Sequence, residues 1–246
     1  MLSKVSGGKS TYGEIIGIIM LDRIFPRIPG DMGNAWTFNF PVKYHVLKEL
    51  NFSSRMKLFN GDKEFINVFI KAAKELEKQG IRAITANCGF IVLYQDVISN
   101  SVNIPVFTSS LLQIPLIYRM LKKDQKIGII TADATSKGLG LKHLKASGAQ
   151  NIPVVIKGME NSEGFKAISQ NRNILDTDLL MNDLINVSIE MTKNNSDIGA
   201  ILLECTNIPP YAKAIQEEIN LPVFDIVTLT NWVYSAVVKK EFLGIM

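Results

Sequence analysis

The chain contains an internal repeat, and this repeat limits the folds that it can adopt. Residues 81–107 align without a gap on residues 198–224, which lie 117 positions later, and 11 of the 27 pairs are identical. In each copy an apolar run ends in a cysteine, Cys88 in the first and Cys205 in the second. A chain of 246 residues is long enough for two lobes. We therefore expect two related lobes, with a site between them that both thiols face.

Short apolar runs alternate with helical patterns along the chain, which predicts parallel sheets flanked by helices. Runs rich in β-branched residues predict strands at residues 14–20, 81–86, 104–107, 126–131, 152–156, 198–203 and 221–224. Residues 22–62 contain several prolines and glycines and predict one long irregular connection. The predicted fold class is α/β, with two pseudo-symmetric lobes, each a mainly parallel sheet flanked by helices, and an active site between them.

A helix predicted at residues 229–240 follows the second copy of the repeat. Because it comes after the second lobe, we expect it to pack back on the first. The predicted lobes are therefore residues 1–109 with 226–246, and residues 110–225.

Both cysteines follow a predicted strand and precede a predicted helix. Ligands bind at this edge of an open parallel sheet. The free amides and positive dipole end of a helix hold anions there and predict a lowered thiol pKa. A single buried cysteine is often inert, but a pair at equivalent positions of a repeat favours a functional site.

The motifs at residues 86–90 and 204–211 resemble those of the aspartate/glutamate racemase superfamily, which also holds hydantoin racemases, maleate isomerases and arylmalonate decarboxylases. The resemblance implies a two-base mechanism without a cofactor. One cysteine, as thiolate, removes the proton α to a carboxylate, and the other, as thiol, protonates the opposite face. Two cysteines argue against the decarboxylases, which keep one.

The resemblance implies that Cys88 and Cys205 are the catalytic pair. The residues expected to bind substrate are Asp22, Asn87, Gly89, Phe90, Thr131, Thr206 and Asn207. The amides at positions 89, 90, 206 and 207 are expected to hold the substrate carboxylate. Solvated loop arginines are the preferred interpretation of Arg23 and Arg27. Side-chain alternation along a strand turns Glu204 away from Cys205, which speaks against a catalytic role.

The chain departs from the family pattern at two positions. Racemases of the family commonly follow the first cysteine with Asn-Thr, where this chain has Gly89-Phe90. They commonly have glycine where Glu204 stands. With fewer side-chain donors, a second substrate carboxylate would be buried without partners. The prediction is a substrate with one carboxylate, or an imide-like ring, in preference to glutamate, unless Arg23 or Arg27 turns inward and binds a second carboxylate.

The predicted function is a racemase or epimerase that acts at the carbon α to a carboxylate of an amino acid or hydantoin-like substrate. Three alternatives stay open. The first is a maleate-type cis–trans isomerase, in which one cysteine attacks a double bond. The second is a non-catalytic protein that binds a small ligand. The third is a redox sensor that forms a Cys88–Cys205 disulfide.

Composition excludes several other classes. The net charge is only +4 and the lysines are scattered, which does not indicate nucleic-acid binding. No apolar run approaches the roughly 18 residues of a membrane span, and the start lacks the apolar core of a signal peptide. We expect a cytoplasmic protein with reduced thiols, no membrane partner and no cofactor. We also expect no metal site, because the two histidines lie far in sequence from the cysteines. A homodimer is left open.

Overall fold

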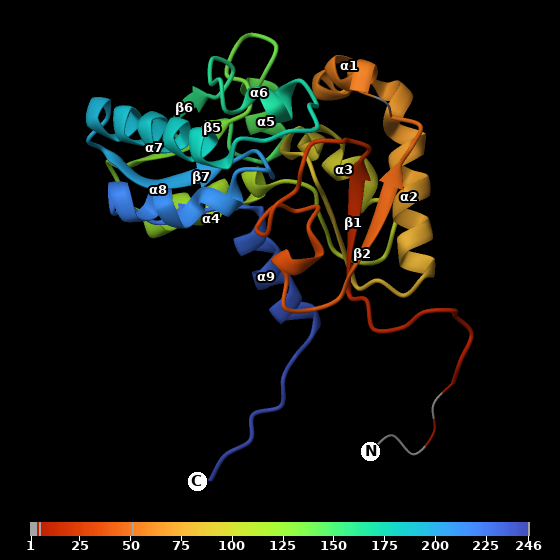
Figure 1. Ribbon diagram of the computed structural model, residues 1–246. Helices are drawn as coiled ribbons and strands as arrows, with labels where there is room; N and C mark the ends of the chain where they lie inside the picture. The colour runs from red at the N-terminus through yellow and green to blue at the C-terminus, as the bar shows by residue number, and fades with distance from the viewer. Residues whose placement is uncertain (1–3, 5, 51, 246) are drawn as a thin grey trace.

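The computed structural model describes residues 4, 6–50 and 52–245. It contains two four-stranded sheets, and all strands within each sheet run parallel (Figure 1). The first sheet has the order β2-β1-β3-β4, with β1 (Ile16–Leu21), β2 (Val42–Leu47), β3 (Ala83–Ala86) and β4 (Val106–Phe107). The second has the order β6-β5-β7-β8, with β5 (Lys126–Thr131), β6 (Val154–Gly158), β7 (Ile198–Leu203) and β8 (Val223–Phe224).

The two sheets have the same topology. In each, the first strand lies between the second and third, and the fourth pairs with the third. The cysteine-bearing strands β3 and β7 occupy equivalent positions. The predicted α/β fold with two pseudo-symmetric lobes is therefore confirmed.

Helices cover both faces of each sheet. The α-helices are α1 (Arg55–Asn60), α2 (Ile66–Lys78), α3 (Gln95–Ser99), α4 (Ile114–Met120), α5 (Leu141–Ala146), α6 (Lys166–Ser169), α7 (Thr177–Asn194), α8 (Ala212–Ile219) and α9 (Ile226–Val237). The 3-10 helices are η1 (Ala35–Thr37), η2 (Phe52–Ser54), η3 (Lys63–Phe65), η4 (Gly89–Tyr94), η5 (Ser110–Gln113) and η6 (Pro209–Tyr211). No helix in the described part of the chain has both the length and the apolar character that crossing a membrane requires.

The prediction of one irregular connection over residues 22–62 is wrong. This segment holds the strand β2 and the helix α1. Strand β2 lies at the edge of the sheet, where it pairs only with β1, and most of its residues are half-buried. A half-exposed edge strand lacks the continuous apolar run of a central parallel strand, so its sequence resembles a loop.

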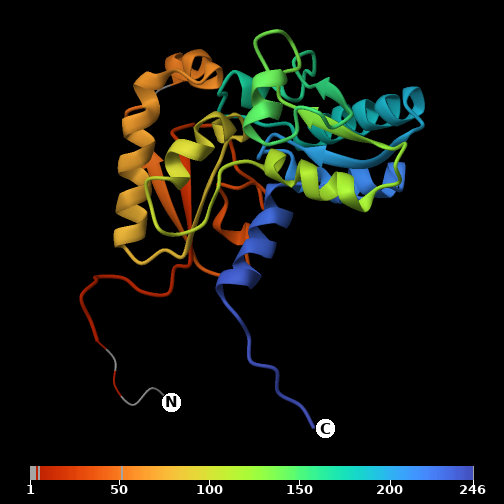
Figure 2. The ribbon, with the colours of Figure 1, turned by 180° about the vertical axis from the view of Figure 1, so that it is seen from behind.

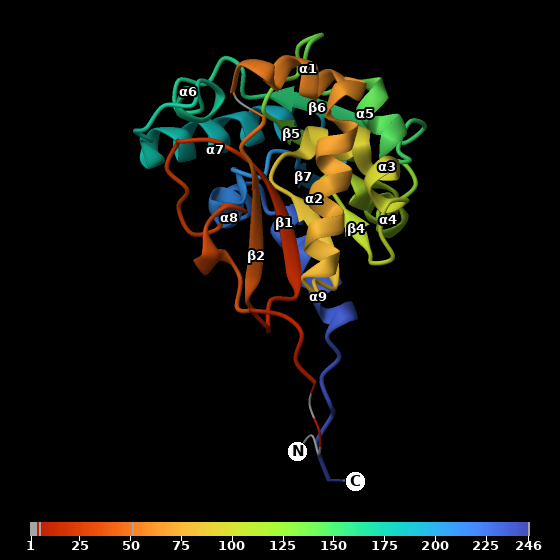
Figure 3. The ribbon, with the colours of Figure 1, turned by 90° about the vertical axis from the view of Figure 1, so that its right-hand side faces the viewer.

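The last helix, α9, packs on the first lobe, although it follows the last strand of the second. Ile226 and Leu229 join Ile16 and Ile18 in one buried cluster, on the face of the first sheet opposite α2 (Figure 2). The lobe limits predicted from the sequence stay a prediction, and residues 1–3, 5, 51 and 246 of the first lobe lie outside the described residues. The segments 6–15 and 238–245 extend from the same end of the molecule (Figure 3).

Candidate active site between the lobes

Both cysteines line one cavity of about 350 Å³ between the lobes. Cys88 follows β3 and stands at the start of η4, and Cys205 follows β7. Among the residues that the sequence predicted for the site, the cavity is also lined by Asn87, Gly89, Phe90, Thr206 and Asn207. The two copies of the repeat thus bring their thiols to a common space.

Backbone amides point at the two sulfurs in matching positions. The Phe90 amide faces the Cys88 thiol, and the Asn207 amide faces the Cys205 thiol. Positions 90 and 207 are themselves 117 residues apart, so the repeat preserves this contact. The Cys205 Sγ also lies 3.5 Å from Asn207 Oδ1. In this structure these two amides are directed at the thiols, and their role as donors to a substrate carboxylate stays a prediction.

The expectation of a lowered thiol pKa is wrong. Burial raises the pKa of Cys88 to about 12, and the nearby Glu204 carboxylate raises it further. Burial and Glu204 also raise the pKa of Cys205. The backbone amides lower both pKa values, but the loss of solvent outweighs them.

Glu204 lies in the cavity wall with its side chain buried. Its Oε2 accepts a hydrogen bond of 2.7 Å from Thr131 Oγ1, and the Ala132 amide also donates to the carboxylate. Burial raises the pKa of Glu204 to about 7. Thr131, predicted as a substrate-binding residue, therefore holds the Glu204 carboxylate in place in the cavity wall.

Gly89 provides the space that the Glu204 carboxylate fills. A Cβ atom at position 89 would overlap Glu204 Oε1 and would lie 2.6 Å from the Glu204 carbonyl oxygen. The two departures from the family pattern are thus one structural feature. The first lobe has no side chain at position 89, and the Glu204 side chain of the second lobe occupies that volume. The repeat could have identified Glu204, because Glu204 in the second copy aligns with Asn87 in the first, and Asn87 was a predicted site residue.

Arg23 and Arg27 both line the cavity. Arg23 is half-exposed, whereas the Arg27 side chain is largely buried, so the preference for a solvated loop arginine is wrong for Arg27. The Arg27 guanidinium lies over the Phe25 ring at 4.5 Å, and its Nη1 donates to Asp31 Oδ1 at 2.8 Å. Its Nη2 is buried and has no hydrogen-bond partner among the residues that the structure describes.

The buried aspartate of the first loop is Asp31, not Asp22 as expected. Asp22 is exposed and does not line the cavity, because the chain turns outward directly after β1. Asp31 accepts a hydrogen bond of 2.7 Å from Asn207 Nδ2, which ties the loop to the second lobe. No local pattern in the sequence indicates Asp31, since the contact joins residues 176 positions apart.

Asn87 and Thr206 hold the two lobes together beside the thiols. Thr206 Oγ1 donates to the Asn87 backbone oxygen at 2.6 Å. The Asn87 side chain accepts from the Leu21 amide at 2.8 Å. Both polar side chains already have protein partners, which fix the edges of the cavity.

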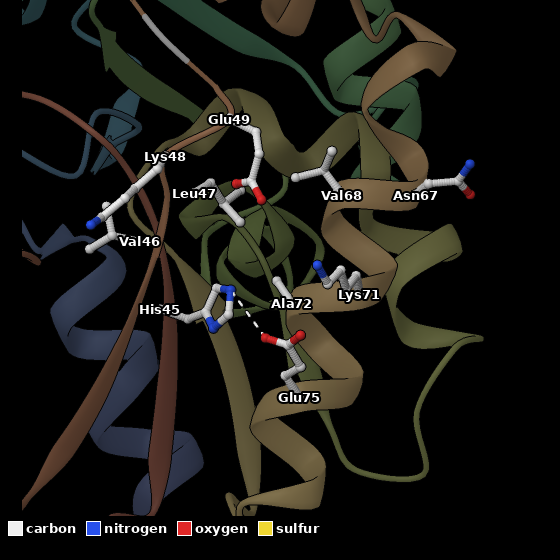
Figure 4. A pocket seen from close by; sticks show the side chains of 10 residues that line it. All are labelled: His45, Val46, Leu47, Lys48, Glu49, Asn67, Val68, Lys71, Ala72 and Glu75. Atoms are coloured by element: carbon white, nitrogen blue, oxygen red, sulfur yellow. Dashed lines mark ion pairs between the residues drawn. The ribbon is translucent and has the colours of Figure 1, made fainter.

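The described residues include no group of three or more histidine, cysteine, aspartate or glutamate side chains that could hold a metal ion. A second cavity, of about 430 Å³, lies between the edge strand β2 and α2 (Figure 4). His45 and Glu75 approach to 3.7 Å across it. An equivalent cavity between β6 and α7 contains the Lys157–Glu190 pair at 2.7 Å. Equivalent cavities thus lie beside the edge strands β2 and β6, and neither is lined by a cysteine.

The comparisons with known proteins fit this geometry. The family model described as Asp/Glu/Hydantoin racemase matches residues 70–233. "Dimethylsulfoniopropionate lyase 7" of Emiliania huxleyi is 32% identical over 237 residues, which are 94% of this chain and 69% of that protein. "Dimethylsulfoniopropionate lyase 6" of the same organism is 30% identical, and the alignment covers 94% of this chain and 61% of that protein.

A solved aspartate racemase from Picrophilus torridus has the same fold, with a TM-score of 0.58 and 20% sequence identity. The superposition covers 92% of this chain and 94% of the racemase.

Proposed function

This chain belongs to the Asp/Glu/hydantoin racemase family, and on that premise we propose that it is a lyase that removes a proton α to a carboxylate and expels a sulfonium group from the next carbon. The proposal keeps the proton abstraction predicted from the sequence. It replaces reprotonation by the loss of a leaving group. Cys88 and Cys205 are the candidate acid–base residues.

The observation that carries the proposal is the set of groups around the cavity. Two thiols line it, and they are the acid–base pair that the resemblance to the family implies. Arg27 presents an unpaired N–H to a carboxylate, and Glu204 presents a carboxylate without an arginine or lysine partner. A small zwitterion complements both charges.

The relatives named dimethylsulfoniopropionate lyase narrow the substrate class. Dimethylsulfoniopropionate carries one carboxylate and one sulfonium group, separated by two carbons. We propose dimethylsulfoniopropionate or a close analogue as the substrate.

The elimination balances with one base. The thiolate sulfur takes the α-proton, and the C–H electron pair forms the double bond between the α- and β-carbons. The bond from the β-carbon to sulfur breaks, and its electron pair stays on the leaving sulfur. Dimethylsulfoniopropionate then gives acrylate and dimethyl sulfide, and the cysteine becomes a neutral thiol.

A cationic substrate also offsets the raised thiol pKa values. In the empty cavity burial favours the neutral thiols. A sulfonium group beside the thiols favours the thiolate, since an opposite charge within several ångströms lowers an acid's pKa. The base would form when its substrate is bound.

Racemisation or epimerisation without a cofactor is the second candidate. It is favoured by the equivalent positions of the thiols, because a two-base mechanism needs a group on each face of the α-carbon, whereas elimination needs one. The products separate the two reactions: an optically inverted substrate in one case and an alkene in the other.

The test is to incubate the purified chain with dimethylsulfoniopropionate and to measure dimethyl sulfide in the headspace and acrylate by chromatography. Cys88→Ser and Cys205→Ser test the thiols separately, and we expect the variant that loses the proton-abstracting base to fall by roughly 10²- to 10⁴-fold in kcat. Glu217→Gln, on the exposed side of α8, serves as the control. Equal activity in both cysteine variants and the wild type would refute the proposed chemistry. Exchange of the α-proton of amino acids or hydantoins without elimination would favour the second candidate.

A further inference from the structure

We propose that Glu204 is a specificity-determining residue whose carboxylate binds the cationic end of the substrate and selects methylated onium groups over neutral ones. The inference rests on the proposed function and assigns a role to a residue that neither the family's two-cysteine mechanism nor the sequence prediction uses.

The first support is the place of the carboxylate. Glu204 comes from the second lobe, but its Oε1 occupies the volume that a side chain at position 89 of the first lobe would fill. The carboxylate is therefore held between the two cysteine turns. Its charge acts on both Cys88 and Cys205, which places it beside the space where the reacting carbons would lie.

The second support is the absence of a protein counter-charge. Glu204 has hydrogen bonds from Thr131 and from the Ala132 amide, and both donors are neutral. None of the ion pairs in the described part of the chain includes Glu204. A buried carboxylate without a cation is unfavourable, and a cationic ligand removes that cost on binding.

The third support is the lining around the carboxylate. Phe90 and Phe165 both line the cavity. A sulfonium or quaternary ammonium group has no N–H to donate, so proteins recognise it by charge and by aromatic faces. A carboxylate beside phenylalanine rings suits this class better than it suits a primary amine, which needs several acceptors.

A zwitterion then has one orientation in the cavity. Its carboxylate binds the free Arg27 Nη2, and its onium group binds Glu204. The reverse orientation would bring two carboxylates together and two cations together. Arg27 is already paired with Asp31, so the attraction of the onium group to Glu204, and the repulsion of a carboxylate from it, are what favour this orientation.

The test uses two ligands of the same shape that differ in one charge: 3-(trimethylammonio)propionate and its carbon analogue 4,4-dimethylpentanoate. Their dissociation constants are measured by calorimetry at pH 8 for the wild type, Glu204→Gln and the control Glu217→Gln. The carbon analogue is an anion, whereas the ammonium ligand is a zwitterion. We expect Glu204→Gln to weaken binding of the ammonium ligand by tenfold or more and not to weaken binding of the carbon analogue. If Glu204 instead only accepts a proton from a thiol, the ratio of the two constants will not change, and the proposal fails.

The wild type tests the same claim without any substitution. Because the pKa of Glu204 is about 7, the affinity for the ammonium ligand should rise between pH 6 and pH 8, and the affinity for the carbon analogue, which lacks the cation, should not. A parallel pH dependence of the two ligands would overturn the proposal even if Glu204→Gln does not fold.

The outcomes separate this inference from the proposed function. Selective binding of the ammonium ligand through Glu204, without any release of dimethyl sulfide, refutes the lyase activity and keeps the cation site. Release of dimethyl sulfide with an unchanged ratio of dissociation constants keeps the lyase and refutes the role of Glu204.

Discussion

The Glu204 carboxylate lies against the α-carbon of Gly89, in the volume that any larger residue at position 89 would need. The contact joins the two lobes at the turn between Cys88 and its helix. It makes a glycine necessary for steric reasons, since Gly89 does not adopt the left-handed backbone conformation that would itself favour glycine.

Gly89→Ala should therefore destabilise the fold and the site together. Overpacking of a closed interior costs about 1–3 kcal/mol, and the displaced carboxylate should reduce activity more than tenfold. Gly140→Ala is the matched control, because a Cβ there meets no atom within 4 Å. The check is urea unfolding and kcat/KM for both variants. Equal effects of the two substitutions would contradict the steric argument.

Glu204→Gln should stabilise the protein at high pH while it impairs activity. In the unfolded chain a glutamate ionises near pH 4.5, but Glu204 in the folded protein keeps its proton up to about pH 7. The unfolded state thus loses its proton first, and stability falls as pH rises through this range. At pH 8 the neutral variant should be more stable by on the order of 1–3 kcal/mol. Urea unfolding of both proteins at pH 5 and pH 8 checks the sign, and a variant less stable at pH 8 would contradict it.

Arg27→Met should raise KM more than it lowers kcat. The substitution removes the free Nη2 that we assign to the substrate carboxylate, a charge-assisted contact worth about 1.5–3 kcal/mol, which corresponds to roughly a 10- to 100-fold change. Arg119→Met, on the exposed end of α4, is the control. Steady-state kinetics gives the division between KM and kcat, and an unchanged KM would exclude Arg27 as the anchor.

Asn207→Ala should loosen the first loop. The variant loses the 2.7 Å bond to Asp31 and leaves that buried carboxylate with fewer donors, at a cost of about 1–3 kcal/mol. The same substitution removes the contact between the Cys205 thiol and Asn207 Oδ1. Lower kcat/KM, together with faster proteolysis within residues 22–41, would be the expected result. Asn231→Ala, on the exposed face of α9, should change neither.

Stability should also fall at acidic pH because of His143. Its ring accepts from the Gly140 amide and contacts the Phe59 carbonyl across the lobes, and burial lowers its pKa to about 4. The unfolded chain takes up this proton near pH 6.5, so the contribution of His143 is complete above pH 6.5 and is lost as pH falls towards 4. His143→Gln should flatten that part of the stability profile, and His45→Gln should not. Urea unfolding from pH 7 to pH 4 checks this.

The sequence predicted the features that repeat. The bounds of β5 and β7 are those expected from their apolar runs, and the resemblance based on the two cysteine motifs is confirmed by the family match. A central parallel strand is apolar along its whole length, which makes it easy to recognise.

The sequence did not predict features that depend on contacts between distant segments. The edge strand β2 has only one neighbour, and its half-exposed residues resemble a loop. The Asp31–Asn207 bond and the fit of Glu204 beside Gly89 each join the two lobes, and no local pattern records such pairs. The thiol pKa values were misjudged because the helix amides are visible in sequence and the depth of burial is not.

The packing of α9 on the first sheet has a consequence for the order in which the protein matures. The strands of the first lobe leave the ribosome early, but one face of their sheet, including Ile16 and Ile18, is covered by residues of the last helix. Phe40 likewise finds its ring partner Tyr234, stacked at 3.7 Å, only near the end of synthesis. A nascent chain that stops before residue 226 therefore exposes an apolar sheet face, a surface that recruits chaperones and promotes aggregation. The first lobe to be translated is thus the last to be completed.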